Sequence, residues 1–452
     1  MPTQTQPLPN SSVSNSVTGK LSLRDRVLHG VKWEFAGQMF SQVWRLGTNL
    51  ILTRILMPEA FGAMALVFSI IFAIRMVSDI GVRDAVIHNE RGDCPEFLNT
   101  VWTILIIRGF ILWGVIVAIA SPFARFYDEP QLTWLLPIVG LMCVARGFAS
   151  TSILTASRHI LARWNVTILV CGNIAGTVSM VILALITRSV LALAIGNVVN
   201  AVVFTAVSYQ FGEHRGHRFC WDRDAAAAVS AFGRWIIPSS ALTILLQQGD
   251  KLILGKLVSS STLGLYSIGS NLAGLPMMIF DRLTNTVLQP LYAKTRDLST
   301  DDAHSKIRRF RMALLASLLP ILWVFIFGSY WVFWILYTDE FLEAHKFCSI
   351  TALGISFRLC TDMGPIFQAH GQAEKHFRIM LVRCIIMLTS MFVGYNMGEY
   401  MGLIWGLAVS PLIYYPYQAW MYRKLGKWQP EIDFSGIAIC LIASGIYFTF
   451  LN

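Results

Sequence analysis

The sequence predicts an all-α, polytopic membrane protein made of two six-helix bundles related by an internal repeat, with an additional C-terminal span or interfacial helix. Three observations support this fold class: the composition, a series of long apolar segments, and a duplicated segment. Of the 452 residues, 55% are hydrophobic and 14% are charged, which excludes an ordinary soluble chain. The net charge of +10 does not indicate nucleic-acid binding, because the basic residues gather in particular loops.

The apolar segments are long enough to cross a bilayer as helices, since a span needs about 20 residues. They lie at 33–54, 60–80, 98–120, 132–154, 164–186, 190–210, 235–257, 263–288, 310–337, 347–367, 379–397 and 401–421. A weaker segment at 434–450 is a further span or lies at the interface. We therefore expect a disordered or interfacial N-terminus (1–26), an N-terminal six-helix lobe (27–211), a cytoplasmic linker (212–229), a C-terminal six-helix lobe (230–422), and a basic loop with the additional hydrophobic segment (423–452).

The first and seventh segments are copies of one another. At a constant offset of 202 positions (33 to 235), Trp, Gly and Asp residues coincide, and the pairs are Trp33 and Trp235, Gly47 and Gly249, Gly62 and Gly264, and Asp79 and Asp281. Leu and Ile matches mean little in membrane segments, but these residue types are informative. Transporter folds are commonly built from such repeats, with the substrate site at the repeat interface.

Lys and Arg are concentrated in the loops on one side of the predicted bundle. The loops on the other side hold only Arg54, Arg125, Arg188, Lys256 and Lys346. The positive-inside rule therefore places the N-terminus in the cytoplasm. The outer loops are too short for a catalytic domain. We find no zinc-binding, phosphate-cradling or nucleophile-elbow motif, and the eight cysteines lack metal-like or redox spacing, so no metal or cofactor is predicted.

The first span carries a polar face. Gln38, Gln42, Arg45 and Asn49 follow the i, i+4, i+7, i+11 pattern of one helix face, and Gln247 continues this polarity in the seventh span. Arg45 lies near the middle of its span, where exposure to lipid costs roughly 2.5–3.5 kcal/mol. Such a face either packs against neighbouring helices or lines a cavity for a polar or anionic ligand.

Further charges lie inside the predicted spans, and bases outnumber acids among them. Arg146 and Arg383 have no carboxylate on their own helices, whereas Arg358 and Asp362 are four residues apart and neutralise each other in one reading. An excess of guanidinium groups favours an anion, and phosphate in particular. Asp250 and Asp362 are the carboxylates best placed to couple transport to an ion gradient.

Several short motifs resemble one known family. The segments 56–62 (LMPEAFG), 250–255 (DKLILG), 263–266 (LGLY) and 288–292 (LQPLY), together with Pro276, are similar to Wzx-type flippases of lipid-linked oligosaccharides, in the multidrug/oligosaccharidyl-lipid/polysaccharide exporter superfamily. The resemblance implies a V-shaped pair of lobes around a cationic cavity. It also implies alternating access that moves undecaprenyl-diphosphate-linked repeat units across the bacterial inner membrane, for exopolysaccharide, capsule or O-antigen synthesis.

The expected partners are this lipid-linked oligosaccharide, membrane lipids and polysaccharide polymerase machinery. Two other functions stay open. A multidrug exporter of the same superfamily would use carboxylates to bind organic cations. A membrane glycosyltransferase or polymerase would need acidic catalytic residues on an outer loop, and the candidates are Asp128, Glu129, Asp339, Glu340 and Glu343. The excess of bases in the spans favours a flippase that is not an enzyme.

Overall fold

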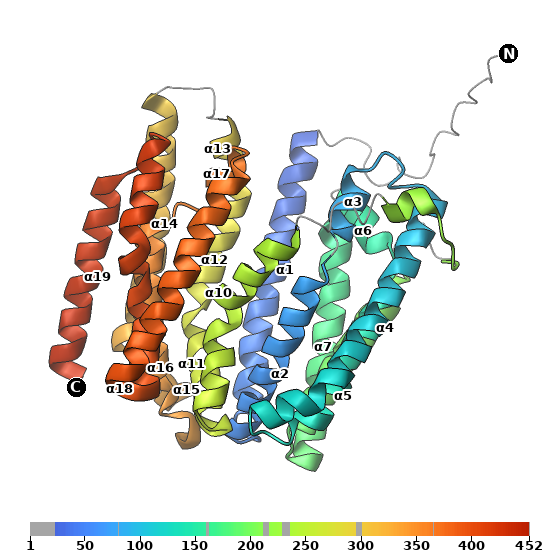
Figure 1. The fold of residues 1–452 in the computed structure, drawn as a ribbon, viewed down its shortest axis with the longest axis horizontal. Coiled ribbons are helices and arrows are strands. Elements are labelled where there is room, and N and C mark those ends of the chain that lie inside the picture. The colour runs from blue at the N-terminus through green and yellow to red at the C-terminus, as the bar shows by residue number, and fades with distance from the viewer. Residues whose placement is uncertain are drawn as a thin grey trace.

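The computed structural model describes residues 23–79, 81–159, 162–210, 217–227, 236–294, 301–364 and 366–451, and the regular structure in these ranges is entirely helical. The long helices stand side by side, so that α1 begins at one end of the bundle and α19 ends at the opposite end (Figure 1). We call the end at which α1 begins the inner end, and the opposite end the outer end.

In the first lobe α1 packs on α7, α7 on α8, α8 on α5 and α5 on α4, whereas α2 packs mainly on the second-lobe helices α10 and α11. The members of the first lobe are α1 (Leu23–Leu52), α2 (Pro58–Val77), α3 (Val82–His88), α4 (Pro95–Phe126), α5 (Leu132–Gly147), α6 (Ser152–Arg158), α7 (Ala162–Thr187) and α8 (Leu191–Ser208). Both α2 and α4 start with proline at the first helical position, where the missing N–H costs no hydrogen bond. Because α1 already begins at Leu23, no separate helix precedes it in the described residues.

The second lobe begins with α10. Its elements are α10 (Ile236–Leu257), α11 (Ser260–Ala273), α12 (Leu275–Leu283), the π-helical η1 (Thr284–Leu288), α13 (Gln289–Lys294), α14 (Asp301–Phe327), α15 (Ser329–Leu336), η2 (Asp339–Phe341), α16 (Ala344–Thr361), α17 (Ile366–Ala369), α18 (Ala373–Lys424) and α19 (Pro430–Leu451). The 52-residue α18 is two helices joined at a kink, where Glu399 has a φ of 52°. These halves correspond to the predicted spans 379–397 and 401–421.

Membrane spans account for most of the long helices. Six described helices are long and apolar enough to cross a membrane, or up to eight when each of two bent pairs counts as one span. The helices at several other predicted spans, such as α1 and α10, are more polar because they carry the charged and amide side chains noted in the sequence. The protein is a multi-pass, all-α membrane protein, as the sequence predicts.

The two lobes meet at the outer end through a repeat-related pair of glycines. A Cβ on Gly62 of α2 would lie 1.8 Å from the backbone oxygen of Ser260, and a Cβ on Gly264 of α11 would lie 1.9 Å from the backbone oxygen of Pro58. Only glycine permits this approach, because any side chain would collide with backbone that cannot move aside. The offset that relates these glycines in the sequence therefore marks a crossing between the lobes.

Polar contacts support this crossing around the rim of the outer end. Lys256 Nζ lies 2.5 Å from Asp128 Oδ2, and the Ser260 hydroxyl donates to the Glu129 carboxylate. An outer-end pocket of about 800 Å³ lies beside the crossing and is lined by residues of both lobes, including Met57 and Glu340. These contacts hold the lobes together at the outer end.

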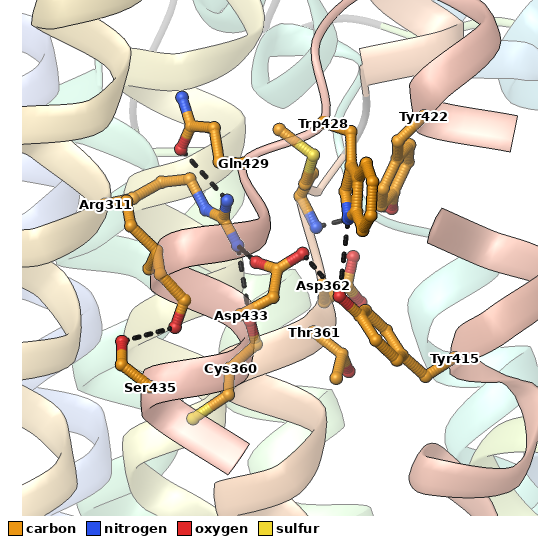
Figure 2. Close-up of polar contacts among 12 residues, drawn as sticks. Arg311, Cys360, Thr361, Asp362, Tyr415, Tyr422, Trp428, Gln429, Asp433 and Ser435 are labelled. Atoms are coloured by element: carbon orange, nitrogen blue, oxygen red, sulfur yellow. Dashed lines mark hydrogen bonds and ion pairs between the residues drawn. The ribbon is translucent and has the colours of Figure 1, made fainter. Parts of the chain in front are cut away.

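The additional helix α19 is attached to the second lobe through a buried ion pair (Figure 2). Arg311 of α14 donates to the Asp433 carboxylate at 2.8 Å, and both side chains are almost fully buried, with 3% and 0% exposed. The Tyr415 hydroxyl donates to the second Asp433 oxygen at 3.1 Å, and Arg311 also donates to Gln429 at 3.0 Å. Arg311 is therefore a core residue, at the start of the predicted span 310–337.

Candidate functional site

The polar face of α1 is divided between two neighbours. Toward α12 of the other lobe, Gln42 Nε2 donates to the Met278 sulfur at 3.0 Å, and Arg45 Nη2 lies 3.8 Å from the same atom. Toward α7, the hydroxyls of Thr48 and Thr177 lie 2.9 Å apart. The two alternatives left open by the sequence, packing and cavity lining, thus belong to different edges of the same helix. Only the edge that carries Gln42 and Arg45 turns toward the opposite lobe.

Arg45 is the central cation at this junction. Its side chain is exposed although it sits well inside α1, and among the described residues it forms no ion pair. Lys251 of α10 lies within electrostatic range of Arg45, and its ammonium group donates to Asn271 Oδ1 at 3.5 Å. Arg45 and Lys251 thus come from repeat-related helices and lie within electrostatic range of each other, although Asp250 acts on Lys251 more strongly than Arg45 does. We call Gln42, Arg45 and Lys251 the interlobe group.

The other predicted residues of these two helices differ in exposure. Gln38 and Gln247 have exposed side chains, and Asn49 is half-buried. Asp250 accepts a hydrogen bond of 2.5 Å from the Tyr266 hydroxyl, on the helix that follows α10. Asp250 is thus engaged within its own lobe, whereas the glutamines stay accessible for hydroxyl groups of a ligand.

Arg358 and Arg383 come together in the second lobe and share one carboxylate. Asp362 Oδ2 lies 3.7 Å from Arg358 Nε and 3.4 Å from Arg383 Nη1. The other Asp362 oxygen accepts the backbone N–H of Gly364 at 2.9 Å, and the Arg383 guanidinium stacks 5.1 Å from the Tyr414 ring centre. The i, i+4 pair read from the sequence forms, and Arg383 finds its carboxylate on another helix. Asp281 of α12 also lies within electrostatic range of both arginines, so the group comprises two acids and two bases.

Arg146 occupies a third place, inside the first lobe. Its guanidinium Nη2 donates to Asn200 Oδ1 on α8 at 3.4 Å and lies 5.4 Å from the Phe204 ring centre. Asn200 Nδ2 in turn donates to Asn173 Oδ1 at 3.1 Å, and Asn173 Nδ2 donates to the Ser41 hydroxyl at 3.3 Å. A chain of amides therefore links Arg146 to the edge of α1 that faces α7.

The predicted site residues thus lie in three separate places rather than in one cluster. Arg45 stands between the lobes, Arg358 and Arg383 stand in the second lobe, and Arg146 stands in the first. Asn173 and Asn200 were not among the predicted residues, although two amides within glycine-rich apolar helices are a usable signal. Met278 was also missed, because a thioether in an apolar segment gives no sign of a polar contact.

This architecture defines a class of protein. Two repeat-related bundles of membrane helices, which meet at the outer end and carry polar and cationic side chains between them, are typical of secondary transporters. The chain belongs to the polysaccharide biosynthesis protein family, whose model matches residues 51–346.

The chain is similar in sequence, over most of its length, to several named proteins. It is 21% identical over 415 residues to the succinoglycan biosynthesis transport protein ExoT of Rhizobium meliloti (strain 1021), covering 88% of this chain and 80% of that protein. It is 19% identical over 408 residues to the lipopolysaccharide biosynthesis protein WzxC of Escherichia coli (strain K12), covering 87% and 80%. The teichuronic acid biosynthesis protein TuaB of Bacillus subtilis (strain 168) is 20% identical over 424 residues, covering 92% and 86%.

Solved structures share the fold at low identity. The lipid II flippase MurJ in an inward closed conformation superimposes with a TM-score of 0.72 at 12% identity, covering 93% of each chain. An inward-facing multidrug resistance MATE family transporter of the MOP superfamily gives a TM-score of 0.59 at 13% identity, covering 88% of this chain and 99% of that one. The fold predicted from the sequence motifs is confirmed as the MOP transporter type.

Proposed function

We propose that this protein is a flippase that moves an undecaprenyl-diphosphate-linked oligosaccharide repeat unit from the inner to the outer leaflet of the bacterial inner membrane by alternating access. Its product would feed exopolysaccharide, capsule or O-antigen synthesis, and polysaccharide polymerase machinery would use it next. The names of the relatives, a succinoglycan biosynthesis transport protein and a lipopolysaccharide biosynthesis protein, support this proposal. So does the fold shared with a lipid II flippase.

The observation that carries the proposal is Arg45. Its guanidinium is exposed in the interior of a membrane helix, turns toward the opposite lobe and has no ion-pair partner among the described residues, and intramembrane charges of this kind mark substrate or ion pathways. Lys251 adds a second positive charge within range. Guanidinium and ammonium groups are the preferred binders of phosphate oxygens. The interlobe group is therefore our candidate site for the diphosphate of the carrier lipid.

The remaining predicted residues complete the site in this proposal. Arg358 and Arg383 contribute guanidinium groups from the second lobe, where Asp362 and Asp281 act on both, and the exposed amides of Gln38 and Gln247 hydrogen-bond sugar hydroxyls. The isoprenoid tail stays in the bilayer, since it gains nothing from a polar interior. No covalent chemistry is required of the protein, so we propose that it is not an enzyme.

Alternating access needs contacts that form in one state and break in another. At the outer end the glycine crossing of α2 and α11 closes the lobes on each other. Nearer the inner end the lobes are joined by an ion pair of 2.8 Å between Glu34 and Arg282, and near the middle of α1 by the hydrogen bond from Gln42 to Met278. Release to the outer leaflet requires that the outer crossing separates while the inner contacts tighten.

A multidrug exporter is the second candidate, because MATE transporters share the fold. An organic cation would need an available carboxylate between the lobes. Asp362 is engaged by two arginines and Asp250 by Tyr266, which also weakens both as ion-coupling residues. The energy source therefore stays a prediction without a preferred residue.

A glycosyltransferase or polymerase is the third candidate. It would need free carboxylates on the outer loops, but three of the five are in structural contacts. Asp128 pairs with Lys256, Glu129 accepts from Ser260, and Glu343 pairs with Lys346 at 3.5 Å. A loss of glycan transfer in vitro after replacement of Asp339 and Glu340 would favour this enzyme function over the flippase.

Complementation in cells tests the proposed function. In a strain that lacks this protein, wild type should restore surface polysaccharide, whereas Arg45→Gln should abolish it at an unchanged protein level in the membrane. Loss of one charge-assisted contact costs about 1.5–3 kcal/mol, or roughly a 10- to 150-fold loss of affinity for the diphosphate. Arg125→Gln, at an exposed position near the outer end of α4, is the matched control and should restore polymer. Normal polymer with Arg45→Gln would remove Arg45 from the site.

A further inference from the structure

The two lobes differ in how they neutralise their repeat-related arginines. Arg146 of α5 and Arg358 of α16 occupy matching places when the segments 141–146 and 353–358 are aligned, at an offset of 212 that implies about ten extra residues upstream in the second half. Arg358 pairs with Asp362, four residues later. The residue four positions after Arg146 is Ser150, whose hydroxyl contacts His217 at 3.0 Å instead. The first lobe has therefore lost, or never had, the acid that balances this arginine in the second lobe.

Two further arginines join Arg146 in the first lobe. Arg75 at the inner end of α2 lies within electrostatic range of both Arg146 and Arg108, and all three guanidinium groups act on the buried Cys143 of α5. Arg108 and Arg146 come together because the helices that carry them, α4 and α5, cross closely. A Cβ on Gly109 would lie 2.9 Å from the Cys143 backbone oxygen.

Of these three, Arg108 already has a structural role. Its guanidinium donates to the Arg75 backbone oxygen and to the Ser78 hydroxyl, each at 3.1 Å, at the C-terminal end of α2. A cation at this end satisfies free carbonyls and interacts favourably with the helix dipole. Arg108 thus fixes the inner end of α2 against α4 and holds Arg75 in place.

Arg75 and Arg146 remain available, since both side chains are exposed and neither forms an ion pair among the described residues. The amide of Asn200 and the ring of Phe204 orient Arg146 without neutralising it. Asp79, four residues after Arg75, is the carboxylate that acts on Arg108 of this cluster. Three guanidinium groups with one acid repel each other, and a bound anion would relieve that repulsion.

We propose that Arg75 and Arg146 form a second anion-binding site, which takes a carboxylate or phosphate substituent on the translocated saccharide. This inference rests on the proposed function. The site is separate from the interlobe group, because Arg45 turns to α12 of the second lobe while Arg146 contacts α8 inside the first lobe. The flippase would then select acidic repeat units, with the diphosphate held at one site and the sugar anion at the other.

Binding measurements on the purified full-length protein in detergent test this proposal. The probes are cellobiose, its 6′-phosphate and cellobiouronic acid, which differ only in the acidic group, and farnesyl diphosphate for the interlobe group. Wild type should bind at least one acidic disaccharide at least tenfold more tightly than cellobiose, and the tighter one identifies the anion as phosphate or carboxylate. The double variant Arg75→Gln/Arg146→Gln should lose this preference but bind farnesyl diphosphate within twofold of wild type.

Three further variants make the result specific. Arg45→Gln should weaken farnesyl diphosphate and spare the acidic preference, Arg125→Gln should change neither, and Arg146→Lys should keep part of the preference because it keeps the charge. The single variants Arg75→Gln and Arg146→Gln should each give an intermediate loss of the acidic preference, which covers the case of an unstable double variant. Equal binding of all three disaccharides by wild type, or a preference that survives in the variants, overturns this site. Failure of wild type to bind farnesyl diphosphate would instead count against the proposed function.

Discussion

Replacement of Gly62 with alanine should open the outer end of the bundle. The new Cβ would lie 1.8 Å from the backbone oxygen of Ser260, and a carbon–oxygen contact needs about 3.3 Å, so α2 and α11 must separate by about 1.5 Å. The obstacle is backbone and cannot rotate away. Overpacking of this kind costs about 1–3 kcal/mol, which would disfavour the outer-closed state by about 5- to 150-fold.

Double electron–electron resonance would measure this opening as the distance between spin labels that replace Met57 and Glu340. Met57 is 62% exposed, Glu340 is exposed, and both line the outer-end pocket, so labels should be tolerated there. Gly62→Ala should shift the distribution to longer distances, and Gly264→Ala should do the same from the other lobe. Gly114→Ala is the control, because a Cβ there meets nothing within 4 Å. An unchanged distribution with Gly62→Ala, or an equal shift with the control, would refute the reasoning.

Two further predictions concern other parts of the fold. Asp433→Asn should lower the midpoint of thermal unfolding, because the substitution leaves the buried Arg311 charge uncompensated, at a cost of about 3–5 kcal/mol. Glu431→Gln, which removes an exposed ion pair with Arg308, is the control and should change the midpoint little. Equal shifts of the midpoint in the two variants would contradict a core role for the pair of Arg311 and Asp433. In the segment 217–227, hydrogen bonds from backbone N–H groups and from Arg91 lower the pKa of Asp222 below the ordinary value of 3.8 for an aspartate. A lowered folded pKa gives stability that is present at neutral pH and lost as the pH falls through that pKa. The rate of amide hydrogen exchange in 217–227, corrected for intrinsic rates, should therefore rise from neutral to acid pH in the wild-type protein. In Asp222→Asn the rate should be high at both neutral and acid pH. Equal protection of the two proteins at neutral pH would contradict this prediction.

The fold followed from the sequence where the signal was local or repeated. Apolar segments marked the long helices, and proline at the first helical position marked the start of α2. The constant offset between Gly62 and Gly264 predicted a duplication, although not that the two glycines touch. Contact between repeat mates depends on how the lobes meet, and no pattern along one helix records that.

The candidate site was harder to predict because ion pairing is a property of neighbouring helices. Arg45 could be singled out as a charge in the middle of a span, and its turn toward the other lobe agrees with a cavity-lining edge. Arg383 had no acid on its own helix, yet it pairs with Asp362 of a different segment. The buried ion pair of Arg311 could not be predicted either, because its partner, Asp433, lies more than a hundred residues further along the chain.

Transport by the purified protein in liposomes tests the central claim most directly. Vesicles would carry a fluorescent undecaprenyl-diphosphate-linked disaccharide, and its translocation would be followed by the accessibility of the sugar to an externally added glycosidase. Wild type should move the lipid far faster than protein-free vesicles, Arg45→Gln should be at least tenfold slower than wild type, and Arg125→Gln should match wild type. A wild-type rate no higher than that of empty vesicles, or an Arg45→Gln rate equal to wild type, would contradict the account.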